Sequence, residues 1–326
     1  MNLTRSKKKD LLYVAVAAFF FLTACVLQTV DDYISDWSVK KTIALLTQYI
    51  FFGLLAYWTA SVISRISDKS ICSGIIVAIA LMGVILFVRL LKYHVFYEET
   101  ATRYLWYSYY IPQCIAPVVL LLTILGMGRK DGKPLAKGWY LLFLPAAALI
   151  LLVFTNDLHE QVFSFAEGLE YSNKIYKWEW GYYLILSWMV GLYLSIGVLL
   201  YVKCRISWCR KKAWIPLVLF VTCFILCVLR EVFDPSFIRM PEAVVFSVVI
   251  VFESLIRIGF IPSNVNHEGL FYLADISASI ADKNLNVVLS SKNAPEITRE
   301  QATLAANGTK TQLSEDLVLR AKAIRG

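Results

Sequence analysis

The sequence predicts an all-α polytopic membrane bundle of about eight spans, followed by a short α+β tail. Two observations lead to this fold class. The chain of 326 residues is 58% hydrophobic and only 17% charged, whereas soluble domains are about 25% charged. The apolar residues are also gathered into runs close to the roughly 20 residues that a membrane-spanning helix needs. Lipid offers no hydrogen-bonding partners to bare backbone groups, so we expect these runs to be helices.

Eight apolar runs are separated by short polar segments. The first follows a basic start, RSKKKD, that resembles the leader of a signal peptide. Its apolar part is long and no A-x-A cleavage site follows it, so we expect a retained first helix. The runs are 11–29, 42–64, 71–91, 104–127, 138–155, 181–202, 213–229 and 241–261.

The charges between the runs predict the orientation of the bundle. One set of connecting segments holds 15 basic and 3 acidic residues, and the alternating set holds 9 basic and 13 acidic residues. The basic set is 1–10, 64–70, 128–137 and 203–212, and the acidic set is 30–41, 89–103, 156–180 and 230–242. Because Lys and Arg favour the cytoplasmic side, we expect both termini in the cytoplasm. The net charge of +8 then reflects topology, and nucleic acid is not an expected partner.

The chain divides into two parts by composition. Residues 1–261 form the predicted membrane bundle, and 262–326 form a polar tail that begins at Pro262. In the tail, SASIADKNLNVVLSS reads as strand, turn and strand, and KNAPEITREQATLA reads as a helix. The tail ends at VLRAKAIRG without a closing strand pattern and is small for an independent core. We therefore expect either a fragment or a stub that needs a partner surface.

A polar group follows the fifth apolar run, in FTNDLHEQVF. On a helix, Asn156, His159 and Glu160 fall along one stripe at spacings of three and four, with Asp157 beside it. An unperturbed histidine changes its charge near pH 6.5, so His159 is a candidate pH sensor. The alternative is a helix end whose side chains simply hydrogen-bond their neighbours. The topology places this group on the outer side.

An aromatic segment starts the fourth run on the same side. Its members are Arg103, Tyr104, Trp106, Tyr107 and Tyr110. Arg103, Tyr104 and Tyr107 share one helical face, while Trp106 and Tyr110 lie on another. A helix that is aromatic on two faces packs inside a bundle or lines a cavity, although Trp and Tyr also collect at membrane interfaces.

Glu253 and Arg257 are ionisable residues in the second half of the last run. Charged side chains within membrane spans are costly and are often functional. Glu253 and Arg257 are four residues apart, so they can pair along a helix. This helix leads directly into the tail, which makes the pair a candidate for signal relay. The alternative is an internal ion pair without a signalling role.

The residue types do not favour catalysis, a metal centre or a cofactor. None of the seven cysteines has C-x-x-C spacing, and there is no H-E-x-x-H, P-loop or G-x-S-x-G motif. Glu98 to Arg103 match E-E-x-x-x-R, a motif that resembles intramembrane prenyl proteases, but the histidine elements of that family are missing. We expect no catalytic residues, no metal and no cofactor.

Two longer motifs carry a family resemblance. RYLWYSYYIP at 103–112 and TNDLHEQVF at 155–163 resemble signatures of the N-terminal seven-transmembrane region of bacterial histidine kinases. Segment 279–298 resembles the opening of a PAS domain. The resemblance implies an input module in a bacterial plasma membrane, a homodimer, and a kinase or other output domain in cis or in trans. The chain lacks the phosphoacceptor helix and ATP-binding boxes, so we expect no enzyme activity from it.

These observations predict a membrane-embedded sensor of a two-component system. Its stimulus would be a small ligand, a proton or a property of the surrounding lipid. Two other classes stay open. One is a transporter, although no inverted repeat is evident. The other is a membrane enzyme that uses His159 with Asp157 or Glu160 as acid and base.

Overall fold

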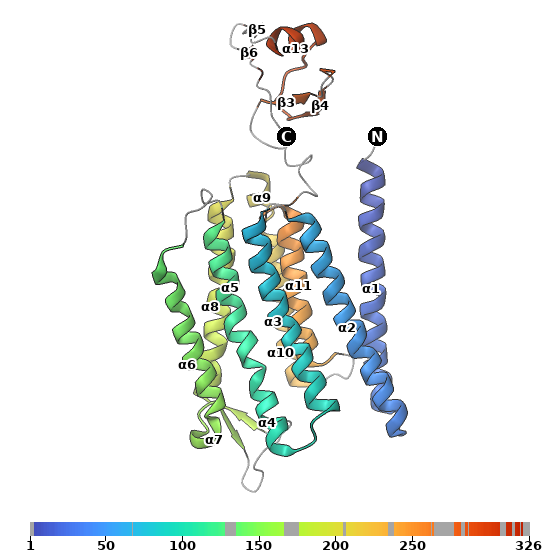
Figure 1. The fold of residues 1–326 in the computed structure, drawn as a ribbon, viewed down its shortest axis with the longest axis vertical. Coiled ribbons are helices and arrows are strands. Elements are labelled where there is room, and N and C mark those ends of the chain that lie inside the picture. The colour runs from blue at the N-terminus through green and yellow to red at the C-terminus, as the bar shows by residue number, and fades with distance from the viewer. Residues whose placement is uncertain are drawn as a thin grey trace.

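The computed structural model shows a bundle of antiparallel helices and a small α+β tail (Figure 1). It describes residues 3–66, 68–127, 135–165, 176–204, 207–233, 238–261, 263, 277–281, 284–285, 287–306, 311–314, 317–319 and 321. The bundle contains α1 (Leu3–Tyr33), α2 (Trp37–Arg65), α3 (Lys69–His94), α4 (Glu99–Ser108), α5 (Tyr110–Gly126), the 3₁₀ helix η1 (Lys137–Leu142), α6 (Phe143–Phe154), α7 (Asn156–His159), α8 (Trp180–Lys203), α9 (Ser207–Lys211), α10 (Trp214–Phe233) and α11 (Met240–Ile258). Strands β1 (Phe163–Phe165) and β2 (Tyr176–Trp178) form an antiparallel hairpin between α7 and α8.

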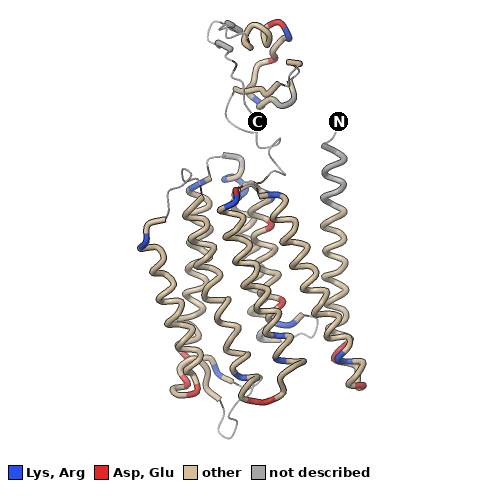
Figure 2. The backbone as a smooth tube through the Cα atoms, viewed as in Figure 1, with Lys and Arg blue, Asp and Glu red and all other residues tan. Residues whose placement is uncertain are grey.

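The bundle has two distinct ends. We call the end with α4, α7 and the β1–β2 hairpin the hairpin end, and the opposite end, with α9, the α9 end (Figure 1). Charged residues of the described bundle gather near these two ends (Figure 2). Among the described residues, seven helical segments are long and apolar enough to cross a membrane, which indicates a multi-pass membrane protein. They are Leu12–Tyr33, Trp37–Arg65, Lys69–His94, Glu99–Gly126, Lys137–Phe154, Trp180–Lys203 and Cys209–Leu229.

Eight spans were predicted, and seven candidate spans occur among the described residues. The difference is α11, which corresponds to the eighth predicted span. This helix has 19 residues and lies beside α3 and α10 (Figure 1). It carries three charged residues, Glu242, Glu253 and Arg257, and it is not among these seven segments. Glu242 was grouped with a polar connecting segment, yet it is fully buried on α11 and paired with Arg89. Such partners allow charged side chains to lie inside a bundle.

Short connections at the two ends start with helix caps. The Asp36 side chain accepts hydrogen bonds from the backbone N–H groups of Ser38 and Val39 and so begins α2. The Asp68 side chain accepts from Ser70 and Ile71 at the start of α3 in the same way. These contacts satisfy N–H groups that have no partner within the first helical turn. Both connections are therefore tight and hold neighbouring helices antiparallel.

The helix of the fourth span is interrupted at Tyr109. α4 ends at Ser108 and α5 begins at Tyr110. Pro112 lies in the first turn of α5, where its missing N–H removes no helical hydrogen bond. The break changes the direction of the chain close to the aromatic segment, so that α4 lies at the hairpin end while α5 runs through the core (Figure 1).

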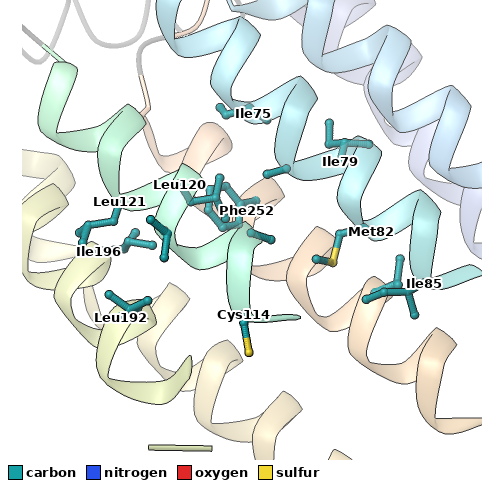
Figure 3. Packing of buried hydrophobic residues seen from close by; sticks show 14 of the residues in the cluster. Ile75, Ile79, Met82, Ile85, Cys114, Leu120, Leu121, Leu192, Ile196 and Phe252 are labelled. Atoms are coloured by element: carbon teal, nitrogen blue, oxygen red, sulfur yellow. The ribbon is translucent and has the colours of Figure 1, made fainter. Parts of the chain in front are cut away.

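The core lies between α3, α5, α8 and α11 (Figure 3). Ile75, Ile79 and Met82 of α3 face Leu120 of α5, and Phe252 of α11 reaches in beside them (Figure 3). Helices α3 and α5 approach closely at Gly74, where an added Cβ would lie 2.0 Å from Thr123 Oγ1. That position therefore needs glycine for steric reasons.

The tail contains two hairpins and one helix in its described part. These are β3 (Ser279–Ala281) with β4 (Val287–Ser290), α13 (Arg299–Ala306), and β5 (Thr311–Ser314) with β6 (Leu317–Leu319). The first hairpin confirms the predicted strand, turn and strand. Helix α13 starts after Pro295, with Thr298 and Gln301 bonded reciprocally as a capping box. The second hairpin corrects the expectation that the tail has no closing strands. The two hairpins form separate sheets, which gives no support to a PAS-like arrangement.

Candidate functional site

Asn156 is the centre of a hydrogen-bonded cluster at the hairpin end. Its side chain is completely buried. Oδ1 accepts from the backbone N–H groups of Val162 and Phe163 at 2.9 and 3.0 Å, and Nδ2 donates to the Phe163 carbonyl at 2.9 Å. One amide therefore satisfies three backbone groups of the segment that follows α7. Its contacts fix the path of the chain into β1.

Asp157 connects this segment to α4. The buried Tyr107 hydroxyl donates to Asp157 Oδ1 at 2.6 Å, and Arg103 Nε lies 3.3 Å from Asp157 Oδ2. Asn156 Nδ2 also lies 3.5 Å from the Tyr107 hydroxyl. The structure thus brings together two predicted groups. Arg103 and Tyr107 come from the aromatic segment, and Asn156 and Asp157 come from the polar group after α6. These side chains are engaged with one another.

The remaining polar residues of the segment do not join this cluster. Helix α7 ends at His159, and Glu160 has a left-handed φ of 48° and is exposed. The expected stripe of Asn156, His159 and Glu160 is therefore wrong, because the helix is too short to continue it. His159 Nδ1 accepts from the Gln161 backbone N–H at 3.0 Å, and Nε2 lies 3.1 Å from Thr155 Oγ1.

The aromatic segment divides between two environments. Tyr104 is 41% exposed and packs against the rings of Tyr107 and Phe154. Trp106 and Tyr110 instead contact Phe163, with ring centroids 4.5 and 5.8 Å away. The aromatic side chains therefore lie on two faces, and on one of them Tyr107 is buried in the bundle.

Phe163 joins the cluster to a set of packed rings. Its ring also contacts Tyr176 of β2 and Tyr182 of α8, at 5.6 and 6.0 Å. The start of α8 is held by backbone bonds from Gly181 N to the Gln161 carbonyl and from Glu179 N to the Val162 carbonyl. A Cβ on Gly181 would lie 2.8 Å from that Gln161 oxygen. The hydrogen-bonded cluster therefore positions Phe163 and the rings that contact it. We call this group of rings, Trp106, Tyr110, Phe163, Tyr176 and Tyr182, the aromatic wall.

A cavity of about 1120 Å³ lies behind this wall. It is lined by residues of α1, α2, α3, α4, α5, β2, α8, α10 and α11. Of the predicted site residues, only Trp106 and Tyr110 line it. Sequence reasoning missed the cavity because its walls come from segments that are distant along the chain. The only sequence signal for it was the two-faced aromatic helix.

The cavity is cationic near the hairpin end. Lys40 and Lys41 of α2, Arg89 and Lys92 of α3, and Arg239 before α11 all line it. Arg239 Nη2 donates to Asp32 Oδ1 at 2.7 Å, and Arg89 is paired with the buried Glu242. Further into the bundle the lining becomes apolar and aromatic, with Met189, Phe220, Phe224, Val248 and Phe252.

A second polar cluster surrounds Glu253 near the α9 end. Arg65 of α2 donates from Nη1 and Nη2 to the two carboxylate oxygens, at 2.8 and 2.7 Å. Trp58 Nε1 donates to Oε2 at 3.0 Å, and Arg257 Nε donates to Oε1 at 2.6 Å. The predicted pairing of Glu253 with Arg257 is confirmed. The contacts with α2 were missed, since nothing in the sequence marks a partner 188 residues away.

No group of three or more His, Cys, Asp or Glu side chains able to hold a metal ion occurs among the described residues. No family model, no curated protein and no solved structure matches this chain. The functional proposal therefore rests on the geometry of its own residues.

Proposed function

We propose that this chain is the membrane-embedded input module of a two-component signalling system, which relays a stimulus to a kinase or other output domain. The observation that carries the proposal is the course of α11. Residues along one side of this helix line the cavity from Met240 to Phe252. The next residue, Glu253, is bonded to Arg65 of α2, and the helix ends five residues later at Ile258. One helix therefore connects a cavity to the start of the tail.

The Glu253 cluster gives α11 a defined position. A bidentate contact between Arg and a carboxylate fixes geometry as well as charge. Phe252 borders both the large cavity and a small void of about 10 Å³ that Trp58 also lines. A ligand that moves the Phe252 ring would therefore disturb the partners of Glu253. Binding shifts the equilibrium only through its different affinity for the two arrangements.

The end of α11 supports transmission into the tail. Gly259 has a φ of 94°, and the Phe260 N–H donates to the Leu255 carbonyl, as in a Schellman motif. The Cys209 thiol of α9 donates to the Ile258 carbonyl at 3.2 Å. These contacts make the exit from the helix well defined, so a displacement of α11 changes where the tail begins.

The remaining parts of the proposal rest on charge and resemblance. The excess of Lys and Arg in the connecting segments at the α9 end favours a cytoplasmic location for that end and for both termini. The resemblance to histidine kinase input regions implies a bacterial plasma membrane, a homodimer, a PAS-like tail and an output domain in cis or in trans. In this proposal the chain itself has no enzyme activity.

The residues at the hairpin end have two roles in this proposal. Trp106 and Tyr110 contact the ligand, because they line the cavity. Asn156 and Asp157, with Arg103 and Tyr107, hold the aromatic wall in place. His159 does not line the cavity, so a His159→Gln variant is expected to keep its response to the stimulus across pH. Loss of that response would show that His159 belongs to the sensing site.

The test is a fusion of this chain to a complete kinase core, with autophosphorylation measured in vesicles. Glu253→Gln removes a charge that accepts four hydrogen bonds from three side chains. Hydrogen bonds to charged groups contribute about 1.5–3 kcal/mol, so we expect the ligand-free activity to change by about tenfold or more. Glu99→Gln, at an exposed position in the first turn of α4, is the matched control.

An unchanged activity in Glu253→Gln, together with an unfolding transition like that of the control, would contradict the relay. The cavity also suits a transported solute, so transport is the second candidate function. Flux of a solute through vesicles that contain the chain without the kinase core would favour it.

A further inference from the structure

The cavity combines positive charge at one end with an apolar interior. Five Lys and Arg side chains line it, namely Lys40, Lys41, Arg89, Lys92 and Arg239. Among the residues that the structure describes, the carboxylates that line it or pair with these cations are Asp31, Asp32 and Glu242. Within this described set, the cations exceed the carboxylates by two. A site of this kind attracts an anionic group.

The apolar part has a definite depth. Phe252 lies twelve residues after Met240, the first residue of α11, which corresponds to about 18 Å along the helix axis. Tyr193 lies thirteen residues after Trp180, the first residue of α8, or about 20 Å. Both helices start at the hairpin end, so the two rings lie at a similar level. The Tyr193 ring contacts the Phe220 ring of α10 at 6.2 Å.

These three rings mark the inner limit of an elongated space. Between them and the cations, the lining includes Met189 of α8, Phe224 of α10, and Val244 and Val248 of α11. Small-molecule sites usually have volumes of about 300–1,000 Å³, and this cavity exceeds that range with about 1120 Å³. Its length and its apolar inner lining suit a long molecule that is apolar over most of its length.

We infer that the cavity binds a single-chain amphiphile with an anionic head, such as an alkyl phosphate or a fatty acid. The head contacts Lys40, Lys41 and Lys92, and the chain extends along α11 to Phe252. This inference deepens the proposed function by naming the ligand class, and it rests on that function only for the consequence of binding. A ligand of this class would place the end of its chain beside Phe252, the residue that precedes Glu253.

The binding test uses the purified full chain in nanodiscs of neutral phosphatidylcholine. Dodecyl phosphate is the probe, and dodecanol is the uncharged comparison. Tryptophan fluorescence reports binding, because Trp37, Trp106 and Trp178 line the cavity. We expect dodecyl phosphate to bind at least tenfold more tightly than dodecanol. Equal binding of the two would overturn the assignment of an anionic head.

Variants separate the head from the chain. Lys40→Gln with Lys41→Gln is expected to weaken the binding of dodecyl phosphate at least tenfold, while Lys137→Gln, an exposed residue at the α9 end, leaves it unchanged. Val248→Trp narrows the apolar part and is expected to weaken dodecyl phosphate but not butyl phosphate. Wild-type affinities in both cavity variants would overturn the inference.

The source of the ligand is distinguished by the lipid. If phosphatidylglycerol in the nanodisc competes with dodecyl phosphate, the cavity accepts a two-chain bilayer lipid through its anionic head, and the single-chain assignment is overturned. If it does not, the ligand is a free single-chain amphiphile. Binding is measured on the chain alone, and kinase output is measured on the fusion to a kinase core. If dodecyl phosphate binds the chain but does not change the output of the fusion, the signalling role is rejected and the binding site is not.

Discussion

Replacement of Asn156 by alanine tests whether the polar segment after α6 is a structural clamp. The variant removes the acceptor for the N–H groups of Val162 and Phe163 and the donor to the Phe163 carbonyl. Asn156 and both of these residues are fully buried. Water cannot easily replace the lost partners, so the cost should appear in the free energy of unfolding.

The magnitude follows from the number of groups that lose a partner. A buried polar group left without a hydrogen bond costs about 1–3 kcal/mol. Losses at neighbouring positions are not additive, so for the three groups at Asn156 we expect a loss of about 3–5 kcal/mol. Asn156→Asp keeps the acceptor but places a carboxylate oxygen where Nδ2 donates to the Phe163 carbonyl, so this variant is also expected to be destabilised.

The assay is reversible unfolding in mixed micelles, followed by tryptophan fluorescence. Gln161→Ala is the matched control, because it removes an amide from an exposed neighbouring position. We expect this control to change the free energy of unfolding by less than about 0.5 kcal/mol. If Asn156→Ala is as stable as Gln161→Ala, the cluster is not a structural clamp, and its residues become available again as a ligand site.

Three further predictions concern packing, charge and orientation. Gly74→Ala should destabilise the bundle by about 1–3 kcal/mol, because its Cβ would overlap Thr123, and Thr123→Ala should restore part of the loss in a thermal unfolding assay. Arg89→Met should cost about 3–5 kcal/mol by leaving Glu242 buried without its partner, and adding Glu242→Met should recover most of that loss in the same assay. Glu160→Cys is made in a chain whose native cysteines are replaced, and it should react with a membrane-impermeant maleimide added outside intact cells. If this cysteine is not labelled in intact cells but is labelled in inverted vesicles, the proposed orientation is wrong.

The spans were predictable because each apolar run carries its own signal. The run at 71–91 corresponds to Lys69–His94, and the run at 181–202 corresponds to Trp180–Lys203. The exception is α11, where charged residues weaken the signal within one span. Local hydropathy does not show that Glu242 has a partner on α3, so sequence alone could not place that residue inside the bundle.

The candidate site was predictable only in part. The residue types of the segment after α6 indicated a cluster, and the aromatic pattern of α4 indicated a buried helix. Their meeting depends on tertiary contacts, such as that between Tyr107 and Asp157, which are 50 residues apart. The bidentate contact of Arg65 with Glu253 and the cavity depend on still longer separations. The strand at 311–314 was missed because TQLS has few of the residues that favour strands.

The 3₁₀ helix before α6 has a consequence for the match between the protein and its bilayer. The segment from η1 through α6 has 18 residues, which as an α-helix would span only about 27 Å. The six residues of η1 rise by about 2 Å each, so the segment reaches about 30 Å, the thickness of a typical hydrocarbon core. It buries Ala146, Leu149 and Val153 along one face and packs against α5 at the edge of the bundle. It has the fewest residues of the seven candidate spans, so a bilayer with a hydrocarbon core thicker than about 30 Å would strain it.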